Sequence, residues 1–94
     1  MTFNGSALVT VVLDHKGRLL ADPQVSTQGL LDEASDETAR TAAVIAAQLA
    51  VEKMSRQDRE LDGMVEDAVR LAVQRSLKAA RGKRPLTQVH VVRV

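Results

Sequence analysis

Residues 42 to 51 read Ala-Ala-Val-Ile-Ala-Ala-Gln-Leu-Ala-Val, and this stretch limits how the chain can fold. A surface helix normally has one apolar stripe and a polar back. A helix through this stretch is apolar on almost every side and offers only Gln48 to water. A small domain cannot easily cover such a helix by itself. We therefore expect a chain built for association rather than for chemistry.

The size and composition fit one small domain with an aliphatic core. The chain has 94 residues, no cysteine, and Phe3 as its single aromatic residue. Without cysteine it has neither a disulfide framework nor a cysteine-based metal site, which fits a reducing cytoplasm. No apolar run reaches the roughly 18 residues of a membrane span. The first five residues also lack the basic and apolar regions of a signal peptide.

Three segments have the pattern of β-strands. Residues 7 to 13 are rich in β-branched side chains and predict a strand largely buried on both faces, and residues 86 to 94 predict the last strand. Asp14-His15-Lys16-Gly17 predicts a four-residue hairpin loop in which Gly17 has a positive φ. Residues 18 to 25 should return antiparallel, at an edge or with a bulge, because Pro23 removes a backbone donor.

Two helices are expected between the second and third strands. The first should run from about 36 to 54, with Ser35 or Asp36 as its cap. Asp58 should cap the second, which reaches about residue 81 and has apolar residues at spacings of three and four. The order is β-β-α-α-β. We therefore predict a two-layer α+β fold, with a three-stranded mixed sheet in the order 2-1-3 and two antiparallel helices on one face.

Charge is distributed unevenly along the chain. All 12 acidic residues lie before residue 68, whereas seven of the 13 basic residues lie after it. Such segregation can mark a surface that binds anions, although cations near a helix C-terminus also complement the helix dipole without any partner. The candidate contacts to RNA or another anion are Arg70, Arg75, Lys78, Arg81, Lys83 and Arg84.

The sequence contains no recognisable catalytic set. His15 falls in a turn and His90 in a strand, and neither belongs to a metal-binding spacing such as H-E-x-x-H. No serine has the G-x-S-x-G context of a nucleophile elbow. The expected sheet also has no aromatic side chain on which single-stranded RNA could stack. We therefore expect no catalytic residue, metal or cofactor in this domain.

An ordered set of short motifs resembles a known family. Phe3-Asn4-Gly5 leads into a valine-rich strand, followed by the turn Asp14-His15-Lys16-Gly17-Arg18. Residues 22 to 26, Asp-Pro-Gln-Val-Ser, run on to Gly29-Leu30-Leu31, and Lys83-Arg84-Pro85 leads into the closing strand. With these spacings, nearly the whole chain resembles the C-terminal domain of bacterial ribonuclease J.

The resemblance implies a larger parent enzyme. Members of the family combine a metallo-β-lactamase domain, an inserted β-CASP domain and this small domain, and they cleave RNA in mRNA decay and rRNA maturation. The two-zinc site of the family uses an H-x-H-x-D-H motif, which this sequence lacks. No catalytic or metal-binding residue can therefore be carried over, and zinc is expected only in the absent catalytic domain.

The resemblance also implies self-association, since the family's C-terminal domain is implicated in it. We therefore expect a non-catalytic domain that holds ribonuclease J protomers together as a homodimer in the cytoplasm, with no membrane partner. The alternatives are an accessory contact to RNA, or docking to another protein or to the parent's catalytic domains. The residues expected to form the association surface are Val9, Val11, Leu13, Val44, Ala47 and Val51.

Overall fold

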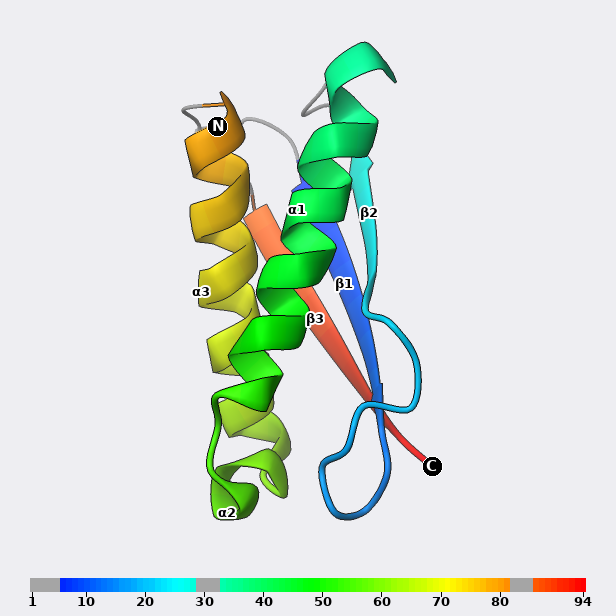
Figure 1. The fold of residues 1–94 in the computed structure, drawn as a ribbon, viewed down its shortest axis with the longest axis vertical. Helices are drawn as coiled ribbons and strands as arrows, with labels where there is room; N and C mark the ends of the chain where they lie inside the picture. Colours follow the sequence, from blue (N-terminus) through cyan, green and yellow to red (C-terminus); the bar gives the residue numbers. More distant parts are fainter. Residues whose placement is uncertain (1–5, 29–32, 82–85) are drawn as a thin grey trace.

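The computed structural model describes residues 6–28, 33–81 and 86–94. Along the chain, the elements are β1 (Ser6–Leu13), β2 (Gln24–Gln28), α1 (Glu33–Glu52), α2 (Arg56–Arg59), α3 (Asp62–Arg81) and β3 (Leu86–Arg93). The strands form one sheet in the order β2-β1-β3, in which β1 is antiparallel to β2 and parallel to β3. α1 and α3 run side by side across one face of this sheet (Figure 1). The predicted α+β fold and strand order are confirmed.

The central strand β1 separates a covered face of the sheet from an open one. Ala7, Val9, Val11 and Leu13 point toward the helices and are at most 3% exposed. The alternate residues of β1 point the other way, and Leu8 among them is 46% exposed. The helices therefore cover one face of the sheet, as predicted. The prediction that β1 is largely buried on both faces is wrong, because no described element covers the other face.

Both long helices bury residues spaced four apart. The inward stripe of α1 consists of three alanines and a valine, and that of α3 of three valines and a leucine: Ala39, Ala43, Ala47, Val51, Val65, Val69, Val73 and Leu77. Spacings of four keep side chains on one face of a helix and form the ridges that helices use to pack. The core among the described residues is built from alanine, valine and leucine, as the composition predicts.

The second strand begins later than the sequence pattern predicts. It starts at Gln24 rather than at residue 18, and an isolated bridge between Leu13 and Leu19 is the only pairing before it. Pro23 precedes the strand instead of interrupting it. Because proline has no backbone N–H to donate to the sheet, continuous pairing begins only after it.

The helix boundaries also differ from the prediction. α1 begins at Glu33, before Ser35 and Asp36, so neither residue caps it. The expected helix from 58 to 81 is divided into α2 and α3. Ser55 caps the short α2 by accepting a hydrogen bond from the Asp58 backbone N–H at 3.1 Å, so Asp58 is not the cap.

The hairpin turn has the predicted chemistry. The Asp14 carboxylate accepts hydrogen bonds from the backbone N–H groups of Lys16 and Arg18, each at 2.9 Å, and Gly17 has a φ of 85°. A Cβ atom on Gly17 would overlap the Cβ of Arg59 in α2. Glycine at this position therefore permits both the left-handed backbone and the close approach of the turn to α2.

We predict that Gly17→Ala lowers the free energy of unfolding by about 1–3 kcal/mol, because alanine is strained at this φ and collides with Arg59. Gly63→Ala is the matched control: no atom lies within 4 Å of the added Cβ. It should be neutral or stabilising by up to about 1 kcal/mol. Urea denaturation of both variants checks this, and equal stability of Gly17→Ala and the parent would contradict the packing of the turn.

The turn also makes stability depend on pH. The hydrogen bond from the Arg18 backbone N–H holds the pKa of the Asp14 carboxyl below its ordinary value of 3.8. A carboxyl with a lowered pKa stabilises the fold above its unfolded pKa, and this contribution is lost as the pH falls through the folded pKa. The parent should therefore be more stable than Asp14→Asn near about pH 6, and this difference should close in strong acid. Urea denaturation at both pH values tests this, and a difference that does not change with pH would contradict it.

Candidate functional site

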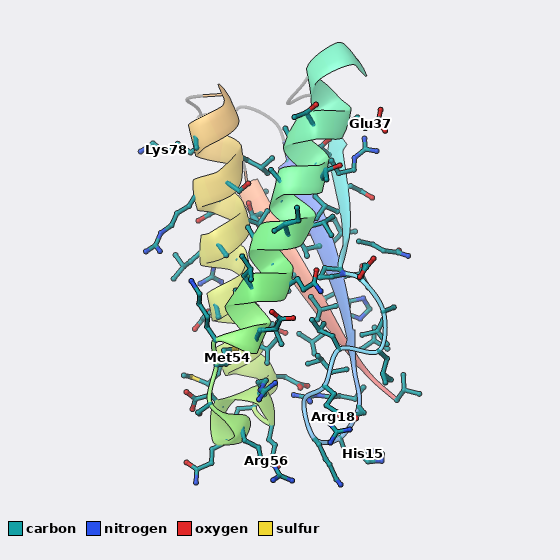
Figure 2. The ribbon with its side chains drawn as sticks, in the orientation of Figure 1. His15, Arg18, Glu37, Met54, Arg56 and Lys78 are labelled. Atoms are coloured by element: carbon teal, nitrogen blue, oxygen red, sulfur yellow. The ribbon has the colours of Figure 1, made fainter. Side chains whose placement is uncertain are left out.

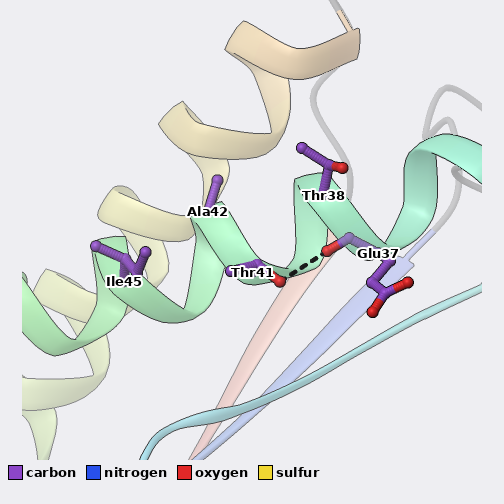
Figure 3. Close-up of a pocket in the computed structure, with 5 residues that line it drawn as sticks. All are labelled: Glu37, Thr38, Thr41, Ala42 and Ile45. Carbon is purple, nitrogen blue, oxygen red and sulfur yellow. Dashed lines mark hydrogen bonds between the residues drawn. The ribbon is translucent and has the colours of Figure 1, made fainter.

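Large apolar side chains lie exposed on the side of the helix pair that faces away from the sheet. Ile45 and Leu49 of α1 are 51% and 45% exposed, and Met64 and Leu71 of α3 are 45% and 48% exposed. We call the surface formed by these four residues and the alanines between them the outer helix face. Figure 3 shows Ala42 and Ile45 on the side of α1 that points away from the strands.

Ile45 and Leu49 point outward because the buried stripe of α1 lies on the opposite side of the helix. At 3.6 residues per turn, Ile45 lies about 200° round the helix from Ala43, which is fully buried. Leu49 continues the same side one turn later. Because alanines fill the inward stripe, the larger Ile45 and Leu49 are left on the outside.

A shallow groove runs between α1 and α3 along the outer helix face, with a volume of about 470 Å³. Its walls include Leu49 and Leu71, and four alanines lie between them: Ala46, Ala50, Ala68 and Ala72. Of the described residues that line the groove, two are charged, Lys53 and Arg75, and both are cations. The groove can thus receive apolar side chains in its middle and acidic groups at its borders.

The residues predicted to form an association surface lie elsewhere. Val9, Val11, Leu13, Ala47 and Val51 are 0–1% exposed within the single chain, and Val44 is partly buried against the same core. Their predicted placement at a surface is wrong. The physical reason is that α1 packs on the sheet through its alanine stripe, which turns Ala47 and Val51 inward over β1.

Ile45, Leu49 and Leu71 were not predicted to lie at a surface. Two runs of residues at spacing four in the sequence would have indicated their exposure. Val65, Val69, Val73 and Leu77 form a run at spacing four in α3, and the corresponding run in α1 is Ala39, Ala43, Ala47 and Val51. Pairing these two runs across the core would have left Ile45 and Leu49 outside.

The predicted basic tract does not form one surface in the described part of the chain. Arg70 forms an ion pair with Asp67 at 2.8 Å and lies in a hollow next to His90 of β3. Arg75 and Lys78 line a different hollow, beside Leu71. Lys83 and Arg84 lie outside the described residues, as does the side chain of Arg81.

The described segments hold no grouping suited to metal chemistry. No three histidine or acidic side chains in residues 6–28, 33–81 and 86–94 come together as metal ligands. His15 and His90 are both exposed, one in the turn and one on the open face of the sheet. None of the helices in these described segments has the length and apolar character needed to cross a bilayer.

Comparison with known proteins identifies the family. The family model described as "Ribonuclease J C-terminal domain" matches residues 1–94. The chain belongs to this family. A ribonuclease J C-terminal domain is thus shown both by the family model and by a curated relative, the ribonuclease J of Sinorhizobium meliloti (strain Sm2011 / Rm2011 / 2011). That protein is 34% identical over 95 residues, which covers 100% of this chain.

The chain spans 17% of the length of this relative. The ribonuclease J C-terminal domain described here is therefore similar to a small part of a much longer nuclease. The main apolar feature of its described surface is the outer helix face.

Proposed function

We propose that this ribonuclease J C-terminal domain holds two copies of its protein together, and that the outer helix face is the contact surface. The observation that supports the proposal is the exposure of Ile45, Leu49, Met64 and Leu71 on a single face. Contiguous exposed apolar surface on a soluble fold usually marks an interaction site.

The open face of the sheet is a weaker candidate for the same role. It carries Leu8 and Leu86, which are 46% and 40% exposed. Their neighbours on that face are polar, however. By the strand register, Leu8 lies between Ser26 and Gln88, and Thr10 beside it lies between Gln24 and His90. The centre of a stable interface is depleted of such groups, which favours the outer helix face.

The outer helix face is large enough for a dimer. α1 and α3 have 20 residues each, which at 1.5 Å per residue makes each about 30 Å long. Two helices at about 10 Å separation present a face about 20 Å wide. Two copies would thus bury about 1,200 Å² in total, which is the lower end of the range for stable interfaces.

The distribution of charge fits a two-fold axis parallel to the helices. Such an axis places α1 of one copy opposite α3 of the other at the same height. Figure 2 shows Glu37 of α1 and Lys78 of α3 at the same end of the molecule. The two-fold axis would bring Glu37 of each copy toward Lys78 of the other at the border of one end of the interface, with Ile45, Leu49 and Leu71 further along the helices.

The proposal gives this domain no part in RNA cleavage. Since the chain spans 17% of the S. meliloti ribonuclease J, we assign cleavage, and any zinc that it uses, to the remaining part of such a protein. The role of the domain is to fix the number and arrangement of the nuclease parts attached to it.

We predict that Leu49→Asp changes the chain from a dimer to a monomer without unfolding it. Leu49 is half exposed in the single chain, so an aspartate there is solvated in the monomer but would be buried without a partner in the dimer. The dimer dissociation constant should rise about 100-fold or more. Sedimentation equilibrium over a micromolar concentration series measures this, with circular dichroism as the check on folding.

Leu20→Asp is the matched control, because Leu20 is 52% exposed but lies in the loop after β1. This variant should remain a dimer with the affinity of the parent. The proposal fails if the parent sediments as a monomer at every concentration, or if Leu20→Asp dissociates the dimer as strongly as Leu49→Asp.

A further inference from the structure

Four basic side chains meet where the hairpin turn approaches α2. Lys16 and Arg18 come from the turn, Arg56 and Arg59 come from α2, and together they line a hollow of about 210 Å³. Figure 2 shows Arg18 and Arg56 at this end of the molecule, far from Lys78 at the other end. We call this hollow the turn–α2 basic pocket. None of its residues belongs to the tract of cations that the sequence pattern singles out.

The backbone around the pocket holds the two segments together. Gly17 packs directly on Arg59, as described above. The guanidinium of Arg93, at the end of β3, donates hydrogen bonds to the Asp14 carbonyl at 3.1 Å and to the Arg59 carbonyl at 2.6 Å. The turn and α2 are therefore joined through a third segment, which holds in place the backbone from which the four cations extend.

The positive charge of the pocket is not balanced by the described residues. Asp62, the carboxylate at the start of α3, forms an ion pair with Arg93 at 2.8 Å, and Asp14 accepts hydrogen bonds from the turn backbone. No described acidic group lies within 4.0 Å of the charged nitrogens of the four pocket residues. In addition, Nε of Arg59 is buried and has no hydrogen-bond partner among the described residues.

Such an arrangement is unfavourable unless an anion completes it. Like charges held close together repel, and a buried donor without an acceptor destabilises the fold. Arginine and lysine side chains converging on one point provide the charge-assisted donors that bind phosphate oxygens. Among the described residues, those that line the pocket are all basic, whereas the centre of a protein–protein contact is normally apolar and aromatic.

We propose that the turn–α2 basic pocket binds a phosphodiester group of an RNA strand. The chemistry of the pocket selects an oxyanion, and its wholly cationic lining favours a nucleic-acid backbone over a protein surface. A contact of this kind is independent of sequence, because it reads phosphates rather than bases. None of the four residues lies on the outer helix face, so RNA binding and self-association can be tested separately.

Fluorescence anisotropy with a labelled single-stranded oligouridylate tests the proposal on the 94-residue chain. Arg18→Gln/Arg56→Gln removes two pocket charges, while Gln24→Glu/Gln88→Glu is a nearly isosteric control on exposed sheet positions with the same change in net charge. We expect the pocket variant to bind about 10-fold more weakly at low salt and its salt slope to fall by about 1.4, because each lost contact to a single strand lowers the slope by about 0.7. The control should change affinity by less than about 3-fold.

Several results would overturn the proposal. Absence of binding between the parent and the oligonucleotide at low salt would contradict it. Equal weakening of binding by the two double variants would also contradict it, because it would indicate an effect of net charge alone. Uridine monophosphate binding as tightly as the oligonucleotide would indicate a site for a free phosphate. Tighter binding of polyglutamate than of the oligonucleotide would indicate an acidic protein as the ligand.

Discussion

The covering of β1 by two helices is the constraint on which the rest of the structure depends. Ala7, Val9, Val11 and Leu13 form the apolar face of the central strand, and they are removed from water by the inward stripes of α1 and α3. Burial of apolar surface is the main force that stabilises such a fold. Once α1 packs through alanines, the geometry of a helix places Ile45 and Leu49 on the opposite side. The apolar outer helix face is thus a direct consequence of how the core is filled.

The sequence predicted the elements better than it predicted their orientation. The first and third strands and the turn at Asp14–Gly17 were predicted correctly, because their residue types have strong local preferences. The second strand was placed too early, since it begins at Gln24. The rotation of α1 about its axis was not predictable in this way, because a helix that is apolar on all sides has no polar face to fix it. For this reason Ala47 and Val51 were assigned to a surface although they lie in the core. The division of the second helix was missed because the apolar residues Leu61, Met64 and Val65 keep the helical spacing across the break between α2 and α3.

The sequence pattern could identify basic residues, but it could not show which of them lie together in the fold. Segregated charge drew attention to the cations after residue 68, but Arg70 faces β3 while Arg75 and Lys78 lie on another side of α3. The cations that do converge, at the turn–α2 basic pocket, are 40 residues apart in the sequence between Lys16 and Arg56. Only the fold brings them together, through Gly17 and the hydrogen bonds of Arg93. The domain thereby presents an apolar surface on one side and a cationic pocket at one end.

Intermolecular NOEs are the most direct test of self-association through the outer helix face. A sample that mixes 13C-labelled and unlabelled chains reports only contacts between copies. Association through this face predicts NOEs from the methyl groups of Ile45, Leu49 and Leu71 of one copy to the helices of the other. Intermolecular NOEs confined to Leu8 and the open sheet face, or none at concentrations where the chain sediments as a dimer, would contradict it.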